Sequence, residues 1–315
     1  MKCLLALLPF ICLASASENL VDCANAANLT TFTSFVNSAG LTDVLREQGP
    51  FTLIVPTNEA FAKLPPATVA SLQKDSSALA NVLQYHVVKG SIYSWDMVSG
   101  EILSSLNGHY IRVYSQGSSL YFNQAKVTKV DLQCSNGVIY LVDEVLNVPE
   151  GTIVDVIKNP DYNISGFMEF LEAAKLTDVF NRTSSQRYTM FVPTNAAIAS
   201  LDADYITKLK SNYIYARHIV DYHVHPGTIH EKSLDHAGTL STMYRDIALV
   251  SDDRCSNFDN ITIRLVSDDT LVTDNNPVLN HAATLQVTDI EAENGVVHII
   301  SHVLIPSTLN PGVVG

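Results

Sequence analysis

The stretch Phe51-Thr-Leu-Ile-Val-Pro-Thr-Asn58 is the most informative segment of the sequence, because it returns later in the chain as Tyr188-Thr-Met-Phe-Val-Pro-Thr-Asn195. Both copies begin with a short apolar run rich in residues that favour β-strands, and the run ends at a proline. Such a run predicts a buried strand that closes at its proline. The Thr-Asn pair that follows predicts the cap of a short helix.

The repeat extends well beyond this stretch. Tyr85-His86 returns as Tyr222-His223 at the same offset of 137 residues. Three further pairs match: Leu41–Leu45 with Leu176–Phe180, Asn28–Thr30 with Asn163–Ser165, and Asn136–Asp143 with Asn294–Ser301. Between its Tyr-His pair and its Asn-Gly pair the second copy is 21 residues longer than the first. A repeat of this length indicates two copies of one globular domain rather than a solenoid.

Apolar residues in both copies recur with helical spacing. The positions i, i+3, i+4 and i+7 that end in the Tyr-His pair predict a helix with each histidine on its apolar side. A second helix is predicted near the start of each copy, and Asn28 and Asn163 stand where its N-cap belongs. The apolar face of that helix comprises Leu29, Phe32, Phe35, Val36 and Ala39 in the first copy and Ile164, Phe167, Phe170, Leu171 and Ala174 in the second.

The end of each copy predicts a hairpin. Asn136-Gly137 and Asn294-Gly295 are dipeptides typical of tight turns, and each is followed by a β-rich run. Together the patterns predict an α+β fold, in which a curled mixed sheet is covered by several helices, built twice.

The strand with its Pro-Thr-Asn end, the Tyr-His pair and the final Asn-Gly-Val hairpin, in this order and present twice, resemble the fasciclin domain. The resemblance implies a β-wedge or β-sandwich of about seven strands packed with helices in each copy. We expect domain one over residues 17–149, domain two over 150–306 and a short tail over 307–315. The family also implies a secreted or surface protein that mediates adhesion between cells and matrix.

The resemblance assigns partner binding to the Tyr-His stretches. The implied partners are integrins or other cell-surface receptors and matrix proteins such as collagen. Because a pair on an apolar helix face is an awkward direct contact, we expect the helix end to shape an adhesive surface while the pair itself is mostly structural. The assigned residues are Tyr85, His86, Val87, Val88, Tyr222, His223 and Val224.

Charge and the first residues of the chain limit the classes of function. With 19 basic and 32 acidic residues, the formal net charge of -13 disfavours a nucleic-acid partner. Residues 1–16 have a positive start, an apolar run and the small-residue end Ala14-Ser15-Ala16, a pattern typical of a secretory signal peptide. Since no run is long enough for a membrane-spanning helix, we expect secretion into the extracellular space or matrix without membrane insertion.

Cleavage of that peptide leaves three cysteines, Cys23, Cys134 and Cys255. An exported chain with three cysteines is expected to form one disulfide, and the sequence allows three pairings. By resemblance to family members with a bridge between adjacent domains, we favour Cys134 with Cys255; the alternative is Cys23 with Cys134 inside domain one.

Four Asn-x-Ser/Thr motifs are candidate N-glycosylation sites in an exported chain. They begin at Asn28, Asn163, Asn181 and Asn260.

No catalytic motif is present, so we expect neither an enzyme nor a cofactor. A histidine cluster in domain two is the one pattern that favours metal binding. We prefer the interpretation that these are scattered surface histidines together with one core histidine. The cluster supports the alternative of a soluble carrier or receptor-like module for a small ligand or metal ion. The cluster comprises His218, His223, His225 and His230.

Overall fold

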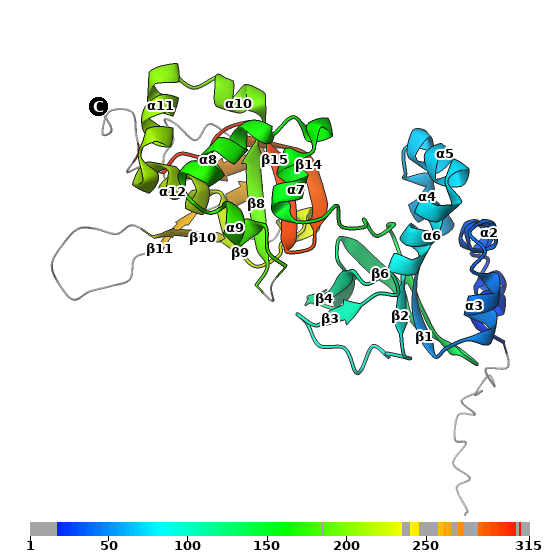
Figure 1. Ribbon diagram of the computed structural model, residues 1–315. Helices are drawn as coiled ribbons and strands as arrows, with labels where there is room; N and C mark the ends of the chain where they lie inside the picture. The colour runs from blue at the N-terminus through cyan, green and yellow to red at the C-terminus, as the bar shows by residue number, and fades with distance from the viewer. Residues whose placement is uncertain are drawn as a thin grey trace, which may run out of the picture. The chain divides into compact units, whose positions relative to one another are not determined.

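The computed structural model describes residues 18–183, 186–234, 240–245, 258–261, 263–265, 270–273, 283–306 and 309 (Figure 1). The predicted signal peptide therefore lies outside the described residues, as does Cys255. The chain divides into two compact units between Val145 and Leu146. In the described part of the chain, no helix combines the length and the apolar character that a membrane crossing requires.

Domain one is α+β. Its helices are α1 (Leu20–Ala26), α2 (Thr30–Ser38), α3 (Thr42–Glu47), α4 (Asn58–Ala62), α5 (Pro66–Lys74) and α6 (Ser76–Tyr85). Its strands are β1 (Phe51–Pro56), β2 (Val87–Lys89), β3 (Ile102–Ser104), β4 (Tyr110–Gln116), β5 (Ser119–Phe122), β6 (Ala125–Cys134) and β7 (Gly137–Val142).

The seven strands form one sheet in the order β2-β1-β7-β6-β5-β4-β3. An isolated antiparallel bridge between Val88 and Ser105 joins the first strand of this order to the residue after the last, so the sheet curls onto itself. Within this sheet β1 runs parallel to β7, from Phe51 opposite Gly137 to Pro56 opposite Val142, while the other pairs are antiparallel. The predicted curled, mixed sheet is confirmed.

Domain two repeats this arrangement. Its helical segments are α7 (Ile153–Lys158), η1 (Pro160–Tyr162), η2 (Ser165–Phe167), α8 (Met168–Ala173), α9 (Thr177–Phe180), α10 (Asn195–Ala199), α11 (Ala203–Ser211), α12 (Tyr213–Tyr222) and α13 (Glu231–Leu234). Its strands are β8 (Tyr188–Pro193), β9 (Val224–Pro226), β10 (Leu240–Arg245), β11 (Phe258–Ile261), β12 (Ile263–Leu265), β13 (Thr270–Thr273), β14 (Ala283–Ala292) and β15 (Gly295–Ile300).

The described strands of domain two form a six-stranded sheet, β12-β13-β14-β15-β8-β9, and a separate pair, β10-β11. Strand β8 runs parallel to β15 in the same register as β1 to β7, with Tyr188 opposite Gly295 and Pro193 opposite Ile300. Both motif strands are buried along their whole length, as their apolar runs predict.

The cores are formed where the helices pack on these central strands. In domain one the helices gather on one side of the sheet (Figure 1), and the predicted face of α2 is buried there, with Phe32 2% and Val36 1% exposed. The matching residues Phe167, Phe170 and Leu171 are fully buried in domain two. The predicted apolar helix faces are therefore confirmed in both copies.

The Pro-Thr-Asn end of each motif strand has two structural tasks. Thr57 and Thr194 cap α4 and α10, since each hydroxyl accepts a backbone N–H of the first turn. Asn58 and Asn195 instead reach back to the start of the domain. The Asn58 amide oxygen accepts the Thr31 N–H at 3.1 Å, and the Asn195 amide oxygen accepts the Gly166 N–H at 2.7 Å.

The prediction that Asn28 and Asn163 are N-caps is wrong. Both adopt the left-handed conformation, with φ of 59° and 54°, a region that asparagine tolerates better than most residues. Helix α2 begins only after Leu29, which makes no side-chain cap. Asn58 and Asn195, far along the chain, supply the oxygen that accepts an N–H at the start of each helix. A local sequence pattern could therefore not locate the cap.

The asparagine of each hairpin dipeptide also connects distant segments of its domain. The Asn136 amide oxygen accepts the Leu20 N–H at 2.8 Å, and its amide nitrogen donates to the carbonyls of Leu45 and Gln48 at 2.9 and 2.8 Å. One side chain thus ties the starts of α1 and the end of α3 to the β6–β7 turn.

Asn294 makes the equivalent bonds in domain two. Its amide oxygen accepts the Ile153 N–H at 2.9 Å, and its amide nitrogen donates to the carbonyls of Phe180 and Arg182 at 2.7 and 3.2 Å. Because this side chain is fully buried, its loss would leave backbone groups without partners away from water.

The glycine of each dipeptide is needed for close approach. A Cβ atom at Gly137 would collide with the carbonyl oxygen of Phe51, and one at Gly295 with the carbonyl oxygen of Tyr188. The predicted hairpins β6–β7 and β14–β15 are confirmed, and glycine lets the parallel strand pack against their second arm.

Candidate functional site

The Tyr-His pair lies at the junction of a helix and a short strand in both domains. Helix α6 ends at Tyr85 and His86 is its C-cap, after which β2 begins; α12, His223 and β9 repeat this junction. The junctions are interior. The exposed fractions are 0% for Tyr85, 2% for His86, 2% for Val87, 3% for Val88, 2% for Tyr222, 0% for His223 and 0% for Val224.

Each histidine is held as a neutral ring. Nδ1 lies 2.8 Å from the Val82 carbonyl oxygen in His86 and 2.7 Å from the Ile219 carbonyl oxygen in His223. A carbonyl only accepts, so Nδ1 carries the proton. In His223 the other nitrogen, Nε2, accepts the Leu304 N–H at 3.0 Å.

Burial lowers the pKa of both His86 and His223 to about 4, and the backbone hydrogen bond opposes this shift without cancelling it. Both rings are therefore uncharged at physiological pH. In this form each ring closes the last turn of its helix and, in domain two, fixes the segment that follows the final hairpin.

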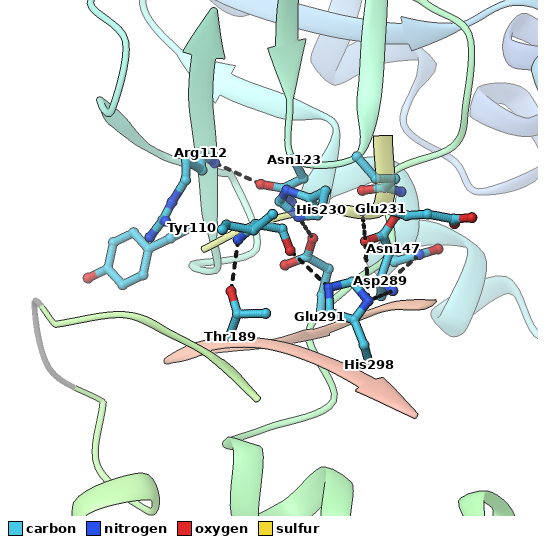
Figure 2. Close-up of polar contacts among 12 residues, drawn as sticks. Tyr110, Arg112, Asn123, Asn147, Thr189, His230, Glu231, Asp289, Glu291 and His298 are labelled. Carbon is cyan, nitrogen blue, oxygen red and sulfur yellow. Dashed lines mark hydrogen bonds and ion pairs between the residues drawn. The ribbon is translucent and has the colours of Figure 1, made fainter. Parts of the chain in front are cut away.

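The tyrosine of the pair is also built into the framework. The Tyr85 hydroxyl donates to the Tyr110 carbonyl at 2.9 Å and accepts from the Asn123 side chain at 2.8 Å. The Asn123 amide oxygen in turn accepts the Arg112 N–H at 2.8 Å (Figure 2). The hydroxyl thus connects α6 to β4 and to the turn after β5.

None of the seven residues assigned to partner binding is exposed enough to form a broad contact surface. Their observed contacts join the helices to the sheet, as a mostly structural role of the pair requires. A direct part in adhesion stays a prediction.

Domain two contains a buried polar cluster that sequence reasoning did not assemble. His230 Nε2 lies 2.6 Å from Glu291 Oε1, and the two residues are 1% and 7% exposed. Nearby, His298 Nε2 donates to the Ile229 carbonyl at 2.9 Å, while its Nδ1 accepts the Asp289 N–H at 3.3 Å (Figure 2). Burial lowers the pKa of His298, and the Asp289 carboxylate opposes this shift without cancelling it.

Domain one has a different set of side chains on the same frame. Tyr140 occupies the position of His298 one repeat earlier, and its hydroxyl contacts the Ile92 carbonyl at 2.9 Å and the Asp131 carboxylate at 2.8 Å. Burial and this carboxylate raise the pKa of Tyr140. Aligning the two copies position by position gives a signal for the cluster, because it pairs His298 with Tyr140 and Glu291 with Gln133.

The four candidate metal ligands are not combined into a site in the described residues. His223 has both ring nitrogens engaged with backbone groups, and His230 faces Glu291. Within the described part of the chain, no group of three or more His, Cys, Asp or Glu side chains is placed to hold a metal ion. His218 lies on α12 and His225 on β9, each partly buried.

The favoured disulfide is wrong. The structure pairs Cys134 with Cys23, the alternative inside domain one, with 6.3 Å between their Cα atoms. The Ser135 N–H donates to the Glu18 carbonyl at 2.8 Å, which, together with the Asn136 contact to Leu20, lays α1 against the end of β6. The partner of Cys134 is therefore chosen by the placement of α1. Cys255 lies outside the described residues.

Three of the four sequons lie where a glycan would meet solvent. Asn28, Asn163 and Asn181 are exposed. The amide oxygen of Asn163 accepts from Asn195 at 2.9 Å and that of Asn181 accepts from Thr152 at 3.0 Å. Both bonds use the oxygen, whereas a glycan is attached to the nitrogen. Asn260 belongs to β11, where the structure describes the backbone alone.

Comparison with known proteins identifies the family. The domains are tandem α+β units, each with a mixed sheet, a Pro-Thr-Asn strand end and a buried Tyr-His junction. The Fasciclin domain profile matches residues 27–149 and 162–306. The chain belongs to the fasciclin family and contains two of its domains in tandem.

Several curated proteins are similar over one or both domains. Human periostin is 26% identical over 278 residues, covering 88% of this chain and 30% of periostin. The pig transforming growth factor-beta-induced protein ig-h3 is 28% identical over 296 residues, covering 94% of this chain and 39% of that protein. The chain thus spans well under half the length of these two relatives.

A shorter relative and a solved structure complete the comparison. The immunogenic protein MPB70 of Mycobacterium bovis is 34% identical over 134 residues, covering 41% of this chain and 68% of that protein. A solved FAS1 domain pair from the insect cell adhesion molecule fasciclin I is 18% identical, covers 91% of this chain and 99% of that chain, and superposes with a TM-score of 0.43.

Proposed function

We propose that this protein is secreted to the extracellular space or matrix and mediates adhesion between cells and matrix through its tandem fasciclin domains. The observation that supports this proposal most is the alignment of nearly the whole two-domain chain with periostin and ig-h3. The proposed partners are integrins or other cell-surface receptors and matrix proteins such as collagen. The proposal includes no catalysis.

The buried framework indicates how such a protein would present its binding surfaces. In both domains the residues shared by the repeats, among them the Tyr-His pair, hold helices, strands and turns together from inside. Adhesion would then depend on exposed residues that differ between the copies, since these are the side chains a partner can reach. The Tyr-His junction would act by setting the shape of the surface above it.

Attachment of cells to immobilised protein tests the proposal. We expect cells to attach above the level of an albumin-coated surface. A chelator of divalent cations should abolish attachment if integrins carry it, because integrins coordinate a ligand carboxylate through a bound cation. Binding of the soluble protein to immobilised collagen tests the proposed matrix partner. Cell attachment at the albumin level together with no collagen binding would refute the proposal.

Conservative variants distinguish a structural role of the Tyr-His pair from direct contact with a partner. Tyr85→Phe removes one hydroxyl from a buried network, and we expect lower stability with attachment retained while the protein is folded. The double variant Tyr85→Ala/His86→Ala should fail to fold domain one. A variant of the pair that keeps its melting temperature and loses attachment would show that these residues make the contact themselves.

The carrier alternative has little support. It relied on the histidines of domain two, and His223 is engaged at both ring nitrogens. The matched relatives also give it no preference over an adhesive role.

A further inference from the structure

An exposed pair of stacked aromatic rings lies in domain one, in the connection between β2 and β3. The rings of Tyr93 and Trp95 are parallel within 5°, with their centroids 4.6 Å apart. Trp95 is 72% exposed, the largest fraction among the exposed large apolar side chains of the described residues. Tyr93 covers one face of the indole and leaves the other face to solvent.

The backbone beneath the two rings is anchored at both sides. The Ile92 N–H donates to the Thr52 hydroxyl at 2.9 Å, and the Ser94 N–H donates to the Asp131 carboxylate at 2.9 Å. The Asp96 N–H closes a turn onto the Tyr93 carbonyl at 2.9 Å. A partner that binds here would meet a preorganised platform, so less conformational entropy is lost on binding.

The same connection in domain two has the same anchors and no aromatic pair. The Ile229 N–H donates to the Thr189 hydroxyl at 2.8 Å, and the Glu231 N–H to the Asp289 carboxylate at 2.9 Å. The residues at the positions of the two rings are His230, which is buried against Glu291, and Lys232. The frame therefore does not require the rings, and they distinguish domain one from domain two.

The stretch of chain that carries the rings is acidic. Residues 91–101 contain two carboxylates, Asp96 and Glu101, and no lysine or arginine. Asp96 is exposed and follows Trp95 directly, while the Glu101 carboxylate accepts the Val98 N–H at 3.1 Å. The formal net charge of the whole chain is -13, which favours cationic partners in general.

We propose that the Tyr93–Trp95 platform binds an arginine side chain presented by a basic segment of a partner protein. A planar guanidinium can stack on the open indole face, which is the aromatic surface that attracts cations most strongly. The same group can bond the neighbouring Asp96 carboxylate through its fork of N–H donors. Lysine fits less well, because its compact ammonium does not stack and stays more strongly hydrated.

Direct binding of a labelled hexa-arginine peptide to the full chain tests this proposal without cells. Fluorescence anisotropy of the label gives the affinity for every variant, and the emission of Trp95, the one tryptophan in the sequence, reports contact at the platform. In low salt we expect saturable binding with a change in this emission. Trp95→Ala should weaken binding by about 3- to 30-fold, and Trp95→Phe should retain most of the affinity.

Two further variants sharpen the test. Trp95→Lys installs the residue of the domain-two position and should weaken binding at least as much as Trp95→Ala. Asp96→Asn should weaken binding and lessen its salt dependence. The matched control is Ile214→Ala, which removes a side chain 55% exposed in domain two and should leave the affinity unchanged.

The proposal is overturned if Trp95→Ala binds the peptide as tightly as the unaltered chain, or if Ile214→Ala weakens binding equally. It is also overturned if hexa-lysine binds as tightly as hexa-arginine, or if neutral maltohexaose changes the Trp95 emission and the peptide does not. Because Trp95 is largely exposed, the variants should keep the melting temperature. Failure of this binding leaves the adhesion proposal in place, since cell attachment is measured separately.

Discussion

Domain one and domain two share their frame and differ in what is placed on it. Both have the parallel pair of central strands, the asparagine at the hairpin turn and the neutral histidine at the helix end. Only domain one has a disulfide and an aromatic platform among its described residues, and only domain two has a buried His–Glu pair there. The shared residues satisfy backbone groups, whereas the differing residues supply the disulfide, the exposed rings and the buried His–Glu pair.

The residues that specify the fold are therefore distinct from the residues that can specify function. A side chain that bonds backbone atoms of distant segments has no close substitute, so both copies retain it. A position whose backbone is anchored by other residues can accept a different side chain. Trp95 in domain one and Lys232 at the matching position of domain two are an example.

The largest difference in stability between the domains should come from the disulfide. Replacing Cys23 and Cys134 by alanine releases a loop with a sequence separation of 111 residues. The chain-entropy estimate for a loop of this size is a loss of about 4 to 5 kcal/mol. Hydrogen exchange read by mass spectrometry should show faster exchange throughout domain one and no change in domain two. Equal loss of protection in both domains would contradict the assignment of the bridge to domain one.

Acid should destabilise domain two more than domain one. The unfolded chain protonates His86, His223 and His298 near the ordinary pKa of 6.5, whereas the folded domains keep these rings neutral to a lower pH. The stability they contribute is complete above pH 6.5 and falls as the pH decreases toward 4, by roughly 3 kcal/mol for a histidine shifted to about 4. Domain two has two of these rings and domain one has one.

Variant His298→Tyr isolates this effect, because it installs the side chain found at Tyr140 in domain one. We expect denaturant unfolding of domain two to depend less on pH between 6.5 and 4 in the variant. Asp221, whose pKa burial raises, offsets part of the slope in both proteins and cancels in their difference. An unchanged slope would show that His298 is not held neutral.

The hairpin asparagines should be unequal in their effects although their bonds correspond. Asn294 is fully buried and Asn136 is partly exposed. Alanine at 294 leaves unpaired backbone groups in the core, at a cost of roughly 2 to 3 kcal/mol, while water can reach the groups freed at 136 and limits the loss to roughly 1 kcal/mol. Chemical denaturation of the two variants checks the order. A larger loss at 136 would contradict it.

The smallest expected effect is the same in both domains. Thr57→Ala and Thr194→Ala each remove one helix cap, for about 1 kcal/mol. Serine at either position keeps the hydroxyl and is the matched control. Thermal unfolding should give equal shifts for the two alanine variants, and a clearly unequal pair would show that the strand ends are not equivalent.

Sequence reasoning recovered the parts of the fold that local patterns encode. Apolar periodicity located the helix faces of Phe32 and Phe167, and the β-rich runs located the central strands. It failed where a residue's partner is far along the chain. The cap supplied by Asn58, the choice of Cys23 by the placement of α1 and the meeting of His230 with Glu291 all depend on tertiary contacts that spacing does not reveal.

The site was predicted only in part for the same reason. Helical spacing placed the Tyr-His pairs on an apolar face, which the structure confirms. It gave no information on what an exposed connection would present, because Trp95 follows no periodic pattern and only its stacking on Tyr93 draws attention to it.

The Tyr-His junctions are internal and uncharged in both domains. Titration of the imidazole proton resonances of His86 and His223 by NMR is the decisive test of this statement. We expect that neither ring titrates above about pH 5, in line with pKa values of about 4. Titration of either ring near its ordinary pKa of 6.5 would place that ring in contact with solvent and show that its junction is not internal.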